Sequence, residues 1–314
     1  MNESSPMVFD RTAVRRHRDR AADGLSDYDF LLSEVGERLA DRLDDVKRTF
    51  PLALDLGCHA GTLAATVGER GGIETLVQCD GAARMARAAA QADSDIGAHP
   101  ALVADEEFLP FAERTFDLVL SSMSLHWVND LPGVLLQINN ALKPDGLFLG
   151  AMLGGETLYE LRQSLLMAES ELEGGAGPRV SPFAQVQDAA ALLQRAGFAL
   201  PVTDVDTITV GYPDALKLMD DLRGMGQSNA VRDRRKSWSR RETLLYAAEL
   251  YHETYGDEEG RIPATFQIIY FTAWRPAADQ PQPLRPGAAK HRLADALDTT
   301  ERSAGDKARP NGTG

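Results

Sequence analysis

The sequence predicts an α/β fold with one mainly parallel, seven-stranded sheet, helices on both of its faces and a helical cap. Between Pro51 and Met152, short apolar runs alternate with helical stretches, a rhythm typical of βαβ units and a parallel sheet. After Met152 the pattern becomes mainly helical, with two more strand-like runs. A chain of 314 residues, 43% of them hydrophobic, is long enough to bury a sizeable core.

The elements of the first half follow one another in a regular order. An amphipathic helix is predicted over residues 28–47, because its apolar side chains recur every three or four positions: Leu31, Val35, Leu39, Leu43 and Val46. Five strands are predicted at residues 52–57, 74–80, 100–105, 116–122 and 146–152. Helices over residues 61–70 and 81–93 separate the first three strands.

The second half adds helices at residues 155–172, 181–198 and 215–226, and strands at 204–212 and 264–274. We expect these strands to complete the same sheet and the helices to cap its carboxyl edge. From Pro276 onward the chain is rich in Pro, Gly, Ala and charge, which predicts a disordered tail. The expected organisation is an N-terminal lid and helix (1–48), a cofactor-binding core (49–152), a cap with the final strands (153–275) and the tail (276–314).

The composition indicates which classes of partner and which cellular compartment to expect. A net charge of -14 argues against nucleic acid or an anionic membrane as the main partner, and favours a small molecule or another protein. The two cysteines, Cys58 and Cys79, lie in strand-like runs without metal-type spacing, which predicts a reduced, cytoplasmic protein. The amino terminus lacks the apolar region of an export signal, and no apolar run reaches the roughly 18 residues of a membrane span.

Acidic residues and glycines follow the ends of the predicted strands. Asp55 ends the first strand, and Gly57 and Gly61 form a tight turn before a helix that begins near Thr62. Glycine lets the backbone approach a ligand, and a helix amino terminus presents unpaired N–H groups. The second strand ends at Asp80, where open α/β sheets hold ribose hydroxyls. The third ends in Asp105 and Glu106, where an acid can accept a hydrogen bond from an adenine amine.

This series, together with FDLVLSS and LKPDGLF, resembles the class I S-adenosylmethionine-dependent methyltransferases over residues 50–152, and implies their Rossmann-like fold. The resemblance implies S-adenosylmethionine as cofactor, with Asp55, Gly57 and Gly61 beside its methionine part, Asp80 at the ribose and Asp105 at the adenine. The chain departs from that family at His59, where a further glycine is usual, so the ring must point away from the cofactor or contact it. NAD is the rival cofactor, but the Gly-x-Gly-x-x-Gly spacing is absent.

Further candidates follow the fourth strand. Ser121 lies at its end, and His126 and Trp127 come after it, where they could flank the cofactor or face the substrate. Core packing of Trp127 and a simple hydrogen bond of His126 are the alternative. Five arginines between Arg11 and Arg20 could form a lid over the cofactor carboxylate, or serve solubility. The six histidines are scattered, so no metal site is predicted.

The predicted cap supplies candidates for substrate contact. Tyr159 and Arg162 lie on one helix, and Gln227 and Asn229 lie in a polar loop between predicted elements. A solvated helix face and an ordinary polar turn are the alternatives. The basic run at residues 232–241 is a solvated helix start, or a docking surface for an acidic partner.

A narrower resemblance covers residues 7–275. The segments VADEEFLPFAERTFDLVLSSMSLHWVNDLP, LKPDGLFLGAMLGGETLYELRQSL, LMDDLRGMGQSNA and IPATFQIIYFTAW are similar to the family of mitochondrial complex I assembly factor 5 and its bacterial relatives. The resemblance implies hydroxylation of an arginine in an iron–sulfur subunit of NADH dehydrogenase, with a respiratory complex I subunit or other protein as substrate and a location peripheral to a membrane complex.

Three functions stay open at this point. The cofactor motifs indicate methyl transfer, whereas the narrower family indicates oxygen insertion, and the sequence has no motif for an iron or flavin that would activate oxygen. The first function is therefore an arginine-modifying enzyme. The second is an O-methyltransferase for a small molecule or malonyl-acyl-carrier protein, since such enzymes share the fold and a similar cap. The third is a non-catalytic assembly chaperone.

Overall fold

The structure is a computed structural model that describes residues 7–92, 99–280, 299–300 and 305. Contacts divide the chain into two units, Met1–Ala277 and Ala278–Gly314, and the first contains every helix and strand described below. Most of the tail predicted from Pro276 lies outside the described residues, and its disorder therefore stays a prediction.

The first unit is built on a seven-stranded sheet with the order β3-β2-β1-β4-β5-β7-β6. The strands are β1 (Leu52–Leu56), β2 (Thr75–Asp80), β3 (Ala101–Val103), β4 (Phe116–Ser122), β5 (Leu142–Leu153), β6 (Ala199–Tyr212) and β7 (Ile262–Trp274). Strands β1 to β5 pair in parallel, and β7 runs antiparallel to both β5 and β6. The predicted mainly parallel sheet, completed by the two late strands, is confirmed.

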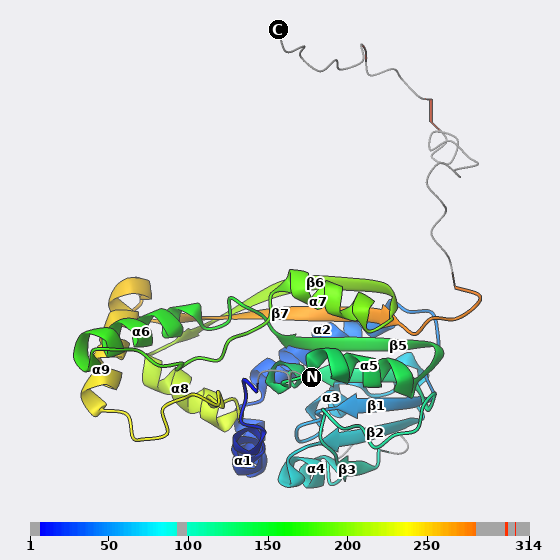
Figure 1. Ribbon diagram of the computed structural model, residues 1–314, viewed down its shortest axis with the longest axis horizontal. Helices are drawn as coiled ribbons and strands as arrows, with labels where there is room; N and C mark the ends of the chain where they lie inside the picture. Colours follow the sequence, from blue (N-terminus) through cyan, green and yellow to red (C-terminus); the bar gives the residue numbers. More distant parts are fainter. Residues whose placement is uncertain (1–6, 93–98, 281–298, 301–304, 306–314) are drawn as a thin grey trace, which may run out of the picture. The chain divides into compact units, whose positions relative to one another are not determined.

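Helices cover both faces of this sheet (Figure 1). Helices α2 (Phe30–Asp44) and α3 (Thr62–Val67) pack on one face with Leu118 and Leu120 of β4, while α5 (Leu131–Ala141) and α7 (Val186–Arg195) pack on the other with Val119. The alternation of Leu118, Val119 and Leu120 between the two cores explains why the inner strands are apolar runs: both of their faces are buried. Helix α4 (Ala83–Ala89) lies beside β2 and β3.

The cap consists of α6 (Tyr159–Glu173), α8 (Ala215–Gly224) and α9 (Arg241–Tyr255). Figure 1 shows these helices beyond the carboxyl ends of β1 to β5, where the prediction placed a cap. Helix α9 begins at Arg241, so most of the basic run 232–241 is a loop before the helix. Three short 3₁₀ segments, η1 (Ala22–Asp27), η2 (Arg70–Gly72) and η3 (Leu125–Trp127), complete the unit.

The sequence predicted neither α5 nor the helix that precedes η1. Helix α1 (Arg11–Ala21) begins at Asp10, whose side chain accepts a hydrogen bond from the Ala13 N–H at 3.1 Å. It packs against α4, η1 and α8, and so lies across the carboxyl ends of the first strands. No helix among the described residues is long and apolar enough to cross a membrane.

Candidate functional site

The fold gathers the strand-end acids at one place. Asp55 at the end of β1, Asp80 at the end of β2 and Glu106 after β3 are buried, and Asp105 lies beside Glu106 with its side chain 25% exposed. Parallel strands that end at the same edge of a sheet bring such residues together, as the sequence predicted.

Two arginines of α1 donate hydrogen bonds to the carboxylate oxygens of three of these acids. The Arg18 guanidinium, only 1% exposed, donates to Asp80 Oδ2 at 3.1 Å, to Glu106 Oε1 at 2.9 Å and to Ser124 Oγ at 2.9 Å. Arg11 donates to Asp105 Oδ1 at 2.8 Å and also to Glu106. Two arginines of α1 therefore bind the acids of the site, and the contact with a cofactor carboxylate expected for this arginine run stays a prediction.

A third arginine completes the charge balance. Arg15, at the margin of the site, donates to Asp105 Oδ2 at 2.9 Å. Three guanidinium groups thus face three carboxyl groups, those of Asp80, Asp105 and Glu106. Buried carboxylates are stable only when they are paired and hydrogen-bonded, and α1 supplies these partners.

The acids differ in their affinity for a proton. Burial raises the pKa of Asp55 to about 8, with a further contribution from the Asp80 charge, so Asp55 is mostly protonated at neutral pH. Burial alone would also raise the pKa of Glu106, but Arg18 and Arg11 outweigh it and lower that pKa to about 2. Neither carboxyl oxygen of Asp55 has a hydrogen-bond partner among the described residues.

The glycine turn after β1 has the backbone that the prediction required. Gly57 and Gly61 have φ angles of +77° and +88°, in the left-handed region that favours glycine. A Cβ at Gly57 would overlap the Ser124 hydroxyl. The space that a side chain would need at this glycine is therefore filled by Ser124. His59 also has a positive φ, 50°, which explains why a glycine is usual at this position.

The His59 ring points into the protein and is buried. Its Nε2 lies 3.3 Å from the Ser122 carbonyl oxygen, and its backbone N–H donates to Asp80 Oδ2 at 3.2 Å. Burial lowers the pKa of His59 to about 3, so the ring is neutral at physiological pH.

Ser121 performs a structural task in this arrangement. Its hydroxyl donates to the Leu56 carbonyl oxygen at 2.7 Å and so ties β4 to β1. The cofactor contact expected for Ser121 stays a prediction.

His126 and Trp127 meet the predicted cap loop. Trp127 Nε1 donates to Gln227 Oε1 at 2.7 Å, and His126 Nε2 lies 3.1 Å from the same oxygen. Because that oxygen is an acceptor, His126 Nε2 carries the ring proton. Burial lowers the pKa of His126 to about 3, which keeps the ring neutral. Gln227 Nε2, in contrast, is buried without a partner among the described residues.

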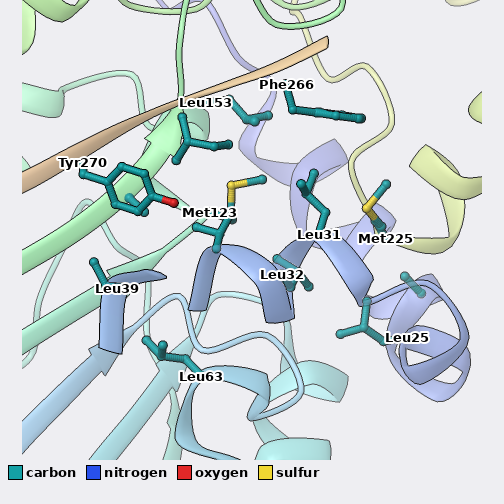
Figure 2. Packing of buried hydrophobic residues seen from close by; sticks show 14 of the residues in the cluster. Leu25, Leu31, Leu32, Leu39, Leu63, Met123, Leu153, Met225, Phe266 and Tyr270 are labelled. Carbon is teal, nitrogen blue, oxygen red and sulfur yellow. The ribbon is translucent and has the colours of Figure 1, made fainter. Parts of the chain in front are cut away.

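An apolar cavity of about 220 Å³ lies between the strand ends and the cap. Figure 2 labels five of its lining residues, which come from α2, β5, β7 and two loops: Leu31, Met123, Leu153, Met225 and Phe266. The polar part of its lining includes Arg179, Arg223, Gln227, Ser228 and Asn229, and Trp127 also lines it. The lining contains no Asp or Glu, so its acceptors for a guanidinium are uncharged groups such as the side chains of Gln227, Ser228 and Asn229.

The four predicted substrate residues fall into two separate pairs. Gln227 and Asn229 line the cavity, whereas Tyr159 and Arg162 do not. Tyr159 is 37% exposed and packs edge-to-face on Tyr255, and Arg162 donates to the Thr157 carbonyl oxygen at 3.0 Å before its own helix. The expectation that all four close over one pocket is therefore not met.

The acceptors expected for S-adenosylmethionine at the strand ends already have hydrogen-bond donors in this structure. The acceptors expected for the ribose and the adenine are engaged by Arg11 and Arg18, and Asp80 and Glu106 are excluded from solvent. Unpartnered buried atoms remain at Asp55, His59 Nδ1 and Ser122 Oγ. Among the residues that the structure describes, no group of three His, Cys, Asp or Glu side chains is arranged to hold a metal ion.

Ser124 and the individual roles of Arg11 and Arg18 were missed at the sequence level. The signal available was the run of five arginines at positions 11–20 together with strand-end acids that had no predicted partner; three of those arginines pair with Asp80, Asp105 and Glu106. Their pairing is not evident from local patterning, because the partners are 62 to 106 positions apart along the chain.

The chain is similar to several known proteins. A "Methyltransferase domain" family model matches residues 54–150. The chain is 51% identical over 290 residues to "Arginine-hydroxylase NDUFAF5, mitochondrial" of Danio rerio, covering 92% of this chain and 89% of the relative. It is 48% identical over 284 residues to the Homo sapiens protein of the same name, covering 90% and 81%. The chain belongs to the NDUFAF5 family.

More distant matches agree on the fold. The chain is also 35% identical over 277 residues to "Malonyl-[acyl-carrier protein] O-methyltransferase" of Methylovorus sp., covering 86% of this chain and 91% of that protein. Among solved structures, the YcgJ protein of Bacillus subtilis superposes with a TM-score of 0.53 at 17% identity, covering 76% and 98%. Two predictions are thereby confirmed: the chain has the Rossmann-like methyltransferase fold, and it is an enzyme of the methyltransferase class.

Proposed function

We propose that the chain is a methyltransferase-fold enzyme that hydroxylates an arginine of a respiratory complex I subunit during assembly of the complex. The observation that carries the proposal is the identity of 48–51%, over about nine tenths of the chain, to proteins named arginine hydroxylases. The malonyl-acyl-carrier-protein methyltransferase match is more distant, at 35%. An iron–sulfur subunit is the substrate that the narrower resemblance favours.

The cofactor that we propose is S-adenosylmethionine, bound at the carboxyl ends of β1 and β2. The matched methyltransferase domain, the positive-φ glycines Gly57 and Gly61 and the strand-end Asp80 support this assignment. In the proposed site Asp80 accepts hydrogen bonds from the ribose, and the backbone at Gly57 lies beside the methionine part. Binding there requires a different position of α1.

We expect a reducing compartment such as the cytoplasm. Cys58 and Cys79 are buried and unpaired, as is usual where disulfides do not form.

The test of the reaction is the intact mass of candidate substrates after incubation with the enzyme. Arginine hydroxylation adds about 16 mass units to an arginine peptide, whereas O-methylation adds about 14 to a carboxylate. A gain of about 14 on malonyl-acyl-carrier protein, with none on arginine peptides, would favour the O-methyltransferase. No gain on either would favour the assembly chaperone.

The same measurement tests the cavity as the substrate site. Gln227→Leu removes the amide oxygen that accepts from Trp127 and is an acceptor for a guanidinium in the cavity, so we expect about tenfold less product, the loss of one hydrogen bond. Tyr159→Phe, a change outside the cavity lining, is the comparison and should leave product formation within about twofold. Equal losses in both variants would contradict this placement of the substrate.

Asp80→Ala tests the cofactor assignment. The lost carboxylate leaves the ribose hydroxyls without a charged acceptor, and a charged hydrogen bond contributes about 1.5–3 kcal/mol, so the affinity should fall roughly tenfold to a hundredfold. Calorimetric titration with S-adenosylmethionine measures it. An unchanged affinity would remove Asp80 from the proposed site.

A further inference from the structure

We infer that α1 is a latch: its arginines and the cofactor compete for the same strand-end carboxylates, so α1 must leave Asp80 and Glu106 before S-adenosylmethionine can bind. The inference rests on the proposed use of this cofactor, and adds a conformational step before binding.

The competition follows from shared acceptors. Asp80, the proposed ribose acceptor, holds Arg18 at 3.1 Å, and Asp105, the proposed adenine acceptor, holds Arg11 at 2.8 Å and Arg15 at 2.9 Å. Glu106 is shared by Arg18 and Arg11. Asp80 is fully buried, its Oδ2 already accepts from Arg18 and the His59 N–H, and its Oδ1 accepts from the Ala82 N–H, so a ribose hydroxyl can reach this carboxylate only when Arg18 leaves.

The space beside Gly57 is also filled, by a serine that hydrogen-bonds to Arg18. Ser124 lies against Gly57, donates to Glu106 Oε1 at 2.8 Å and accepts from Arg18 Nη2 at 2.9 Å. Arg18, Glu106 and Ser124 therefore form one hydrogen-bonded unit at the glycine where the cofactor backbone is expected to pass. Movement of Arg18 would release Ser124 as well as the two carboxylates.

Helix α1 is attached mainly by charge, as a removable element would be. Its apolar contacts are few: Ala13 and Val14 join Phe9, Trp127, Ala230 and Val231 in a small separate cluster, and only Ala21, its last residue, joins a main core. The helix is otherwise rich in charged side chains, and Arg11, Arg15 and Arg18 make its ion pairs with the strand-end acids. Undocking α1 thus exposes little apolar surface and lets the freed carboxylates return to water.

The latch lowers the apparent affinity of the cofactor. A ligand that binds only the open form is weakened by the fraction of molecules that are open, so mutations that open the latch tighten binding without adding any contact to the ligand. This direction is opposite to the effect of removing a residue that contacts the cofactor.

The first experiment compares Arg18→Gln with Arg16→Gln by calorimetric titration with S-adenosylmethionine. Both variants remove one positive charge from the same helix, but Arg16 is exposed and forms no ion pair with the described residues, so it is the matched control. We expect Arg18→Gln to bind at least about tenfold more tightly than wild type, and Arg16→Gln to stay within about twofold. Weaker or unchanged binding by Arg18→Gln would overturn the latch.

A background without the latch also sharpens the test of Asp80, because this residue holds α1 in the wild type. In Arg18→Gln, addition of Asp80→Ala should weaken cofactor binding more than the same change does in the wild-type chain. An equal loss in the two backgrounds would mean that Asp80 does not couple the cofactor to α1, and would contradict the inference.

A second measurement does not depend on any variant folding. Amide hydrogen exchange of the wild-type protein, with and without S-adenosylmethionine, reports whether α1 leaves its site. We expect faster exchange in residues 11–21 when the cofactor is bound. Unchanged or slower exchange there, together with measurable binding, would overturn the latch and leave the cofactor assignment intact. No binding to wild type or to Arg18→Gln would remove both the cofactor assignment and the latch.

Discussion

Replacing Gly57 by alanine is expected to lower the free energy of unfolding by about 2–5 kcal/mol. The φ angle of +77° places a non-glycine residue in the left-handed region, which costs about 1–2 kcal/mol. The new Cβ would also overlap the side chain of Ser124, and overpacking of a closed site costs about 1–3 kcal/mol more. Denaturant unfolding measures the sum.

The chain offers a matched control at Gly174. Its φ and ψ angles, +73° and 13°, are left-handed, but an added Cβ there meets no heavy atom within 4 Å. Gly174→Ala should therefore cost only the conformational part, about 1–2 kcal/mol. Equal losses for the two variants would show that Ser124 moves away from Gly57 freely, and that this contact does not close the turn.

Stability is expected to be greatest near pH 6.5. Burial lowers the pKa of both His59 and His126 to about 3, whereas an unfolded histidine titrates near 6.5. Below pH 6.5 the unfolded chain therefore binds two protons that the folded protein does not, and stability falls as the pH falls. Asp55 opposes this, because burial raises its folded pKa to about 8 while the unfolded residue ionises near 4.

Addition of these contributions gives a slope on each side of the maximum. Between about pH 4 and 6.5, His59 and His126 against Asp55 leave one net proton, which makes stability rise by about 1.4 kcal/mol per pH unit. Burial also lowers the pKa of His17, which steepens this rise, and raises the pKa of Asp80, which opposes it. Between pH 6.5 and 8 Asp55 makes stability fall by about 1.4 kcal/mol per unit. Denaturant unfolding at a series of pH values measures both slopes.

Asp55→Asn separates the two slopes. The variant has no proton to lose at this position, so the decrease above pH 6.5 should disappear while the decrease on the acid side becomes steeper. Persistence of the alkaline decrease in Asp55→Asn would show that another group causes it.

Most of the sheet could be predicted because its information is local. Runs such as residues 116–122 are apolar on both faces, and this pattern survives in any α/β fold with helices on both sides. The acids Asp55, Asp80 and Glu106 could be placed together for the same reason, since each follows a strand of one parallel sheet. The strand limits were less accurate: β6 begins at Ala199, five positions before the predicted residue 204.

What the acids bind could not be predicted, because it depends on pairing between distant segments. The residues of α1 have only a small apolar face, so hydrophobic periodicity gave no clear helix there. The helix is held by ion pairs with residues far along the chain, which local propensity does not encode. Tyr159 and Arg162 were misplaced for a related reason: their helix position was correct, but the face that α6 turns to the cavity is set by its packing on α9 and β7.

The order of α1 and its partners along the chain has a consequence for biosynthesis. Arg18 is made 62 residues before Asp80, 88 before Glu106 and 106 before Ser124. On the ribosome the arginines of this helix therefore have none of their acidic partners until β2 and the segment after β3 have been translated, and Arg18 meets Ser124 only after β4. Contacts that close such long loops form late. Helix α1 is thus translated before the acids that it binds and docks only after them, and during that interval the nascent chain presents a basic segment without its acidic partners.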